Sequence, residues 1–177
     1  MKALLIYPEF RTVSFWDYRE TCELVDARYP AAPLGLVTIA AMLPSEWEIR
    51  LVDRNVEKLE NSALEWADVV LTGGMMPQQL DCLDLIRTAR KMGKTVIVGG
   101  PDATSSPHLY SEASHLVLGE GEVTLPAFLA NSGSPLGEPS RSILPAPPPC
   151  LKIRLKTRLP QCLPTATRSK TSKKRSI

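Results

Sequence analysis

Short apolar runs, separated by glycine, proline and charged residues, dominate the first 130 residues and predict a buried sheet. Continuous apolar runs, rather than alternating ones, are typical of parallel strands that are covered on both faces. Longer segments with apolar residues at helical spacing predict helices between these runs. The predicted strands are residues 2–7, 48–52, 68–72, 95–98 and 114–118, and the predicted helices are residues 34–43, 62–67, 78–92 and 123–129.

This alternation of strands and helices predicts an α/β fold with a mostly parallel sheet and helices on both faces. The expected architecture is a Rossmann-like (flavodoxin-like) three-layer sandwich with a five-stranded parallel sheet in the order 2-1-3-4-5. In such sheets ligands bind outside the carboxyl ends of the strands, here beside the first and third strands. The clearest amphipathic helix is 78–92, in which Leu80, Leu83, Ile86 and Ala89 or Arg90 recur at helical spacing.

The composition changes after residue 131. Half of the 16 prolines lie between Pro135 and Pro164, and no aromatic residue follows Phe128. Residues 141–177 hold 10 of the 21 basic residues and none of the 19 acidic ones. Such a segment buries too little apolar surface to offset its ordering entropy. We therefore expect a folded domain at 1–131 and a disordered, Pro-rich basic tail at 132–177.

Three of the predicted strands end in glycine-rich turns, which together predict a ligand-binding edge. Glycine has no Cβ, so backbone can approach a ligand closely there. Each turn also has a purely structural interpretation, as a tight connection between a strand and a helix. The candidate binding residues are Thr72, Gly73, Gly74 and Met75, then Gly99, Gly100 and Pro101, and finally Gly119, Glu120 and Gly121.

Several other sites are not expected. The chain has no Gly-x-Gly-x-x-Gly after the first strand and no glycine-rich Gly-x-x-x-x-Gly-Lys-Ser/Thr loop, which argues against NAD and ATP. Its two histidines and four cysteines are not at metal-ligand spacing, so no metal site and no catalytic residue are predicted. The basic tail lacks interleaved aromatic residues, so nucleic acid is not an expected partner. The first residues read as a buried strand rather than a signal peptide, which predicts a cytoplasmic protein without a membrane partner.

Taken together, short motifs in residues 1–130 resemble the amino-terminal cobalamin-binding domain of cobalamin-dependent radical SAM proteins. Each motif is weak alone, and their order over about 120 residues carries the resemblance. The motifs are Leu4-Leu5-Ile6-Tyr7-Pro8, Pro33-Leu34-Gly35-Leu36, Val52-Asp53-Arg54-Asn55, Asp68-Val69-Val70, Val98-Gly99-Gly100-Pro101 and Gly119-Glu120-Gly121-Glu122.

The resemblance implies that cobalamin lies at the carboxyl edge of the sheet, with the three glycine turns against the corrin ring and its nucleotide tail. In that family, methylcobalamin relays a methyl group to a substrate radical made by the partner domain. The Asp-x-His-x-x-Gly motif that supplies a histidine ligand to cobalt in methionine-synthase-type domains is absent here. The resemblance therefore implies cobalamin binding without such a ligand.

The chain departs from the family by lacking Cys-x-x-x-Cys-x-x-Cys, which would hold an iron–sulfur cluster. No such cluster is expected in this chain, and we expect it to bind without catalysing. The change near residues 132–145 would fit a reading-frame shift, a split gene or a natural stand-alone domain. Two alternatives stay open: one subunit of a split methyltransferase that pairs with a radical SAM subunit, and a regulatory or interaction module of flavodoxin-like fold without a cofactor.

Overall fold

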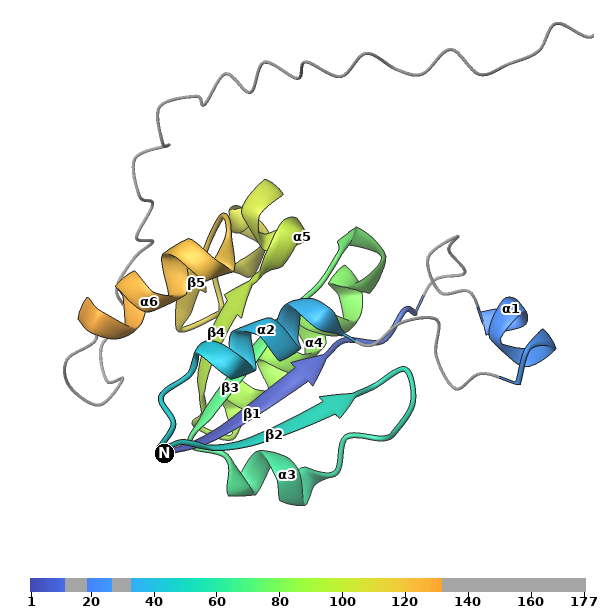
Figure 1. Ribbon diagram of the computed structural model, residues 1–177, viewed down its shortest axis with the longest axis horizontal. Helices are drawn as coiled ribbons and strands as arrows, with labels where there is room; N and C mark the ends of the chain where they lie inside the picture. Colours follow the sequence, from blue (N-terminus) through green and yellow to red (C-terminus); the bar gives the residue numbers. More distant parts are fainter. Residues whose placement is uncertain (12–18, 27–32, 132–177) are drawn as a thin grey trace, which may run out of the picture. The chain divides into compact units, whose positions relative to one another are not determined.

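A computed structural model of the protein describes residues 1–11, 19–26 and 33–131, which contain a five-stranded parallel sheet (Figure 1). The strands lie in the order β2-β1-β3-β4-β5, so the predicted fold class and strand order are confirmed. All four neighbouring pairs are parallel. The strands are β1 (Lys2–Tyr7), β2 (Glu48–Asp53), β3 (Val69–Gly73), β4 (Thr95–Gly99) and β5 (His115–Val117).

Helices connect the strands, as the sequence predicts. Two short 3-10 helices, η1 (Met76–Gln78) and η2 (Pro107–Tyr110), precede α4 and β5. The α-helices are α1 (Arg19–Leu24), α2 (Leu34–Met42), α3 (Asn61–Trp66), α4 (Gln79–Lys91), α5 (Gly100–Ser105) and α6 (Gly121–Asn131).

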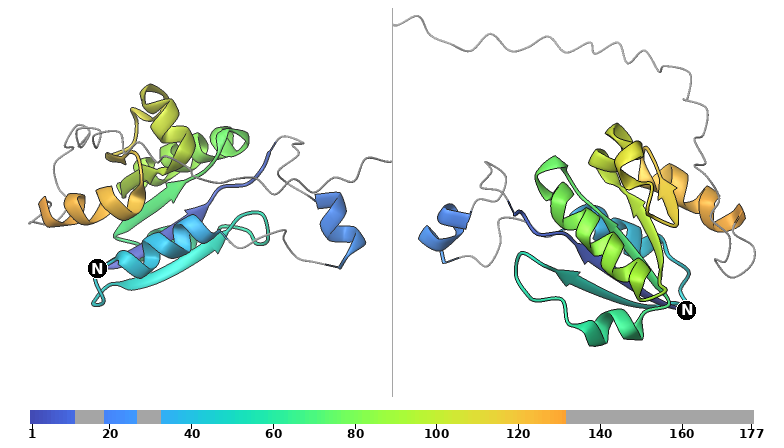
Figure 2. Two further views of the ribbon diagram at one scale, coloured as in Figure 1. Left: turned by 45° about the horizontal axis from the view of Figure 1, so that its top comes forward. Right: turned by 180° about the vertical axis from the view of Figure 1, so that it is seen from behind.

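The sheet has a hydrophobic core on each face, which makes the expected three layers. On one face, Leu4, Ile6 and Val70 pack with side chains of α3 and α4. On the other, Leu5 and Leu71 pack with α2 and α6. The two sides are visible in Figure 1, where α2 crosses in front of the sheet, and in the rear view of Figure 2, where α4 lies in front. Alternation along each strand therefore decides which core a side chain enters.

The predicted buried stripe of the 78–92 helix is wrong at its start. Leu80 is 58% exposed, whereas Asp81, Cys82 and Leu85 are buried together with Ile86 and Ala89. The chain first forms the 3-10 turn η1, and α4 begins only at Gln79. Because a 3-10 turn has about 3.0 residues per turn rather than 3.6, the buried face starts at a different phase.

Two helices have no counterpart among the predicted ranges, α1 (Arg19–Leu24) and α5. Gly100–Ser105, which the sequence suggests is a turn, forms α5, with Pro101 in its first turn and Asp102 buried. Proline is favoured at the first helical position because its missing N–H would be unpaired there.

The described residues hold no helix that is both long enough and apolar enough to span a membrane. The expected disordered tail, residues 132–177, lies outside the described residues, and the domain boundary at residue 131 stays a prediction.

Candidate functional site

A cavity of about 260 Å³ lies at the carboxyl ends of β3, β4 and β5, on the face covered by α2 and α6. Apolar side chains line its interior, from the strands and from both helices. These are Leu71, Ile97 and Val117 from the sheet, Leu36 and Ile39 from α2, and Leu125 from α6. The cavity is therefore built for an apolar group rather than for a charged one.

The three glycine turns meet at this cavity. Nine of the ten predicted site residues line it: Thr72, Gly73, Gly74, Met75, Gly99, Gly100, Pro101, Gly119 and Gly121. The tenth, Glu120, is exposed and is not among the lining residues. Its carbonyl instead accepts hydrogen bonds from the backbone of Val123 and Thr124, which begins α6. The turns come from separate strands, and the parallel sheet brings their ends together.

Several of these glycines are required by the packing of the strand ends. A Cβ on Gly73 would lie 2.3 Å from the carbonyl oxygen of Gly99, its partner in the sheet register. A Cβ on Gly99 would lie 2.9 Å from the carbonyl oxygen of Val117. Gly100 has a φ of +90°, which L-residues rarely adopt. The structural interpretation of these turns is thus sufficient to explain their glycines.

Two other glycines have free space beside them. At Gly35, a Cβ would meet nothing within 4 Å, and at Gly119 it would meet only the Thr124 methyl group at 3.9 Å. Gly35 lies on the same helical face as Leu36 and Ile39, so its missing side chain leaves room at the cavity. Gly35 is not among the ten predicted site residues, although it occurs in one of the quoted motifs.

Thr72 lines the cavity, but its hydroxyl group is hydrogen-bonded to another part of the protein. Its Oγ1 donates to the carbonyl of Ile6 at 2.8 Å and lies 3.9 Å from the Sγ of Cys82. Both partners belong to the core on the opposite face. Burial raises the pKa of the Cys82 thiol to about 12, so it is a neutral core group at physiological pH.

Three polar lining residues, Tyr7, Gln78 and Glu122, are not among the ten predicted site residues. Gln78 is fully buried and bridges two segments: its Nε2 donates to the Pro8 carbonyl at 2.6 Å, and its Oε1 accepts from the Met75 N–H at 3.0 Å. The end of β1 is thereby joined to the glycine turn after β3. The only available signal was the alternation of β1, which places Tyr7 on the same face as Ala3 and Leu5.

The Tyr7 phenol is protonated at neutral pH. Burial raises its pKa above the usual 10.0, a hydrogen bond with the Gln78 side chain opposes that shift, and the charge of Asp53 adds to it. A protonated phenol is a hydrogen-bond donor, and its ring can line an apolar cavity. Of the described residues that line the cavity, Glu122 alone carries a formal charge, and it is exposed.

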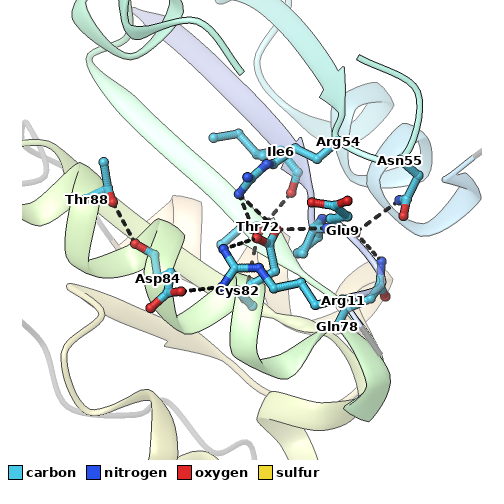
Figure 3. Close-up of polar contacts among 12 residues, drawn as sticks. Ile6, Glu9, Arg11, Arg54, Asn55, Thr72, Gln78, Cys82, Asp84 and Thr88 are labelled. Carbon is cyan, nitrogen blue, oxygen red and sulfur yellow. Dashed lines mark hydrogen bonds and ion pairs between the residues drawn. The ribbon is translucent and has the colours of Figure 1, made fainter. Parts of the chain in front are cut away.

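The segment after β1 is held in place by a buried carboxylate, Asp81, which is 0% exposed. Figure 3 shows Glu9 and Arg11 of this segment near the side chain of Arg54. Asp81 accepts the Glu9 N–H at 2.8 Å and pairs with Arg54 at 2.9 Å and Arg11 at 2.7 Å. A buried carboxylate with three donors is satisfied, and it fixes whatever donates to it.

Asn55 holds the same segment from the other side. Its Nδ2 donates to the Pro8 carbonyl at 3.1 Å, and its Oδ1 accepts the Phe10 N–H at 3.0 Å. Asp53 in turn accepts from the backbone and the side chain of Asn55, both at 2.9 Å. The motif Val52-Asp53-Arg54-Asn55 thus acts through the loop that follows β1, at the edge of the cavity.

The described residues contain no group of three or more His, Cys, Asp or Glu side chains that could hold a metal ion. What the cavity offers is apolar surface, backbone at the glycine turns, and the two polar side chains of Tyr7 and Gln78. This arrangement can bind the apolar part of an organic ligand at the edge of the sheet.

Comparison with known proteins identifies the class of domain. The B12 binding domain family matches residues 22–129. An uncharacterized methyltransferase of Synechocystis is 47% identical over 131 residues, which are 73% of this chain and 24% of the relative. The hopanoid C-2 methylase of Rhodopseudomonas palustris is 35% identical over 127 residues, which are 70% of this chain and 24% of that protein.

No solved structure matches the chain. The chain spans about a quarter of the length of the curated relatives it matches. The family match covers more than half of the chain and most of its described part, including β2 to β5 and the three glycine turns. The chain therefore belongs to the B12-binding domain family.

Proposed function

We propose that this chain binds cobalamin at the cavity between the sheet, α2 and α6. The observation that carries the proposal is the convergence of three separate glycine turns on one apolar cavity at the carboxyl edge of the sheet. Membership of the B12-binding domain family supports the identity of the ligand.

The cavity fits one part of cobalamin, the planar benzimidazole that ends its nucleotide tail. Pockets that enclose a whole drug-sized ligand measure roughly 300–1,000 Å³. At about 260 Å³ this cavity is smaller, and its lining is apolar. The corrin ring, which is larger, would lie outside the cavity across the turns at Gly74–Met75, Gly100–Pro101 and Gly119.

The cofactor would supply a cobalt atom able to carry and transfer a methyl group. The residues of this chain would do the binding: the helices α2 and α6 exclude water from the tail, and the turns present backbone to the ring. The segment Pro8–Arg11, fixed by Asn55 and Asp81, sets the position of that edge.

We further propose that the chain serves a radical SAM methyltransferase-type protein as its cobalamin-carrying part. Both curated relatives are named as methylating enzymes and are about four times as long as the matched region. The radical SAM partner, as a domain or a separate subunit, would hold the iron–sulfur cluster, because the three-cysteine motif is absent from this sequence.

A cavity-filling pair of variants tests the site. Gly35→Leu should place a side chain in the open space beside Leu36 and Ile39, whereas Gly35→Ala adds a single methyl group. We expect Gly35→Leu to weaken hydroxocobalamin binding at least about tenfold, because the tail can no longer enter. Gly35→Ala should bind much more nearly as the wild type does.

Binding is measured by titration of the full chain followed by desalting and a visible spectrum, with thermal unfolding as a check of folding. Wild-type affinity in a well-folded Gly35→Leu variant would rule out this cavity. A wild-type chain that retains no corrinoid would favour the cofactor-free interaction module instead.

A further inference from the structure

Tyr7 lines the cavity, and among the described residues no acceptor is found for the proton of its hydroxyl group. Tyr7 is the last residue of β1, and alternation along the strand places its side chain on the same face of the sheet as Ala3 and Leu5. Both of these residues pack in the core beneath α2 and α6. Tyr7 therefore reaches the cavity from the sheet, among apolar neighbours such as Leu71 and Ile39. A polar group in such a lining restricts which ligand groups can bind beside it.

The side chain of Gln78 is a polar neighbour of the Tyr7 phenol. The amide nitrogen of Gln78 has two hydrogens, and one of them goes to the Pro8 carbonyl. The Gln78 side chain also lowers the pKa of the Tyr7 phenol, so the two polar groups lie close together. The Gln78 oxygen already accepts the Met75 N–H. These two hydrogen bonds hold the Gln78 side chain beside the Tyr7 phenol.

The phenol retains its own proton as a donor. Among residues 1–11, 19–26 and 33–131, none accepts a hydrogen bond from it, whereas the Tyr110 hydroxyl donates to the Asp102 carboxylate at 2.5 Å. A ligand that enters the cavity with an unpaired acceptor would satisfy the Tyr7 proton, and an apolar ligand of equal shape would not.

We propose that Tyr7, oriented by Gln78, is the specificity-determining contact that recognises the ring nitrogen of the benzimidazole tail. This inference rests on the proposed function, since it assumes that the tail enters the cavity. A benzimidazole that has left cobalt carries a free ring nitrogen, which accepts one hydrogen bond. Burying that nitrogen without a donor would weaken binding. The cavity should therefore prefer cobamides, the class of cofactors that includes cobalamin, whose tail ends in a base with such a ring nitrogen. Cobamides whose tail ends in a phenol should bind less well.

The test compares two cobamides on two proteins. Hydroxocobalamin has the ring nitrogen, and the cobamide with a p-cresol base has the same corrin and tail without it. Dissociation constants are measured for the full wild-type chain and for Tyr7→Phe. Free cobalamin can hold its own base on cobalt, but this solution property is common to both proteins and cancels when the two ratios are compared.

We expect Tyr7→Phe to weaken hydroxocobalamin binding about 3- to 10-fold, the range for one neutral hydrogen bond. It should leave the affinity for the p-cresol cobamide within about twofold. Tyr110→Phe is the matched control, because it removes a phenol hydroxyl that lies outside the cavity lining. That control should leave the ratio of the two affinities unchanged.

Gln78→Leu provides a second variant, in which Tyr7 keeps its hydroxyl but loses its orienting partner. This variant should also reduce the preference for hydroxocobalamin over the p-cresol cobamide. Its thermal stability should be lower, because Pro8 and Met75 lose their hydrogen bonds to Gln78. An equal effect of Tyr7→Phe on both cobamides, or no effect on either, would overturn the assignment of Tyr7. If the wild type retains neither cobamide, the proposed function itself fails, which is a different result.

Discussion

The glycines of the candidate site divide into two kinds according to what a side chain would meet. At Gly73 and Gly99 a Cβ would collide with the backbone of the next strand, while at Gly35 it would meet nothing. Sequence reasoning found the first kind because glycine clusters after strands are visible in a pattern. It missed Gly35 as a site residue, because a glycine in an apolar helix gives no local sign of the space beside it.

The polar site residues Tyr7 and Gln78 were missed for a different physical reason. Each stands in a segment that reads as secondary structure, one at the end of an apolar strand and the other near a helix start. Their roles depend on hydrogen bonds between Gln78 and Pro8, which are 70 positions apart. Such contacts follow from the fold and have no signature in spacing.

The two kinds of glycine should respond oppositely to alanine. Gly73→Ala should lower the free energy of unfolding by about 1–3 kcal/mol or more, since a Cβ would lie 2.3 Å from the Gly99 carbonyl oxygen. Gly35→Ala should raise it by about 0.5–1 kcal/mol, because alanine is the better helix former. Urea unfolding of both variants measures the difference, and equal stabilities would contradict the described packing.

Tyr110 should make the protein sensitive to alkaline pH. Burial and the hydrogen bond to Asp102 raise the pKa of its phenol above the usual 10.0. The unfolded chain then loses this proton at a lower pH than the folded chain, so stability is complete below pH 10 and falls as pH rises above it. Between pH 8 and pH 11, the free energy of unfolding should decline less for Tyr110→Phe than for the wild type. An identical decline in both proteins would count against the buried phenol.

At the scale of elements, β1 and α4 are coupled by the carboxylate of Asp81, which binds the loop that follows the strand. The strands themselves were predictable, because parallel strands buried on both faces are continuous apolar runs. Three features were not: the short helix α1, the helix α5, whose glycine and proline resemble a turn, and the phase of α4, which the 3-10 turn η1 shifts. Short elements whose conformation depends on tertiary contacts leave little trace in a pattern.

Removing the charge of Asp81 should be costly, and a neighbouring carboxylate on the same helix provides the control. Asp81→Asn should lower the free energy of unfolding by about 3 kcal/mol, since Arg54 loses a buried partner. Asp84 also pairs with Arg11 but is exposed, so Asp84→Asn should remain near wild type. Urea unfolding separates the two, and a larger loss for Asp84→Asn would contradict the role assigned to Asp81.

At the scale of the whole molecule, every described residue that lines the cavity lies between Tyr7 and Leu125. The family match to residues 22–129 covers nearly the same part of the chain. We therefore propose that cobalamin binds to the predicted domain at 1–131. The composition of residues 132–177 predicts a separate segment, which lies outside the described residues.

Deletion of residues 132–177 should leave the affinity for hydroxocobalamin within about twofold of the full chain, because the proposed contacts remain. Parallel titrations of the two proteins, with thermal unfolding of each, provide the comparison. A well-folded shortened chain with much weaker binding would assign part of the site to the deleted segment.

The central claim is that this chain alone binds cobalamin, and its most direct test is stoichiometric. The purified full chain is titrated with hydroxocobalamin, desalted, and examined by visible spectroscopy. We expect close to one equivalent of corrinoid to remain, with band positions that report benzimidazole displaced from cobalt. Complete loss of colour from a chain that circular dichroism shows to be folded would contradict the claim.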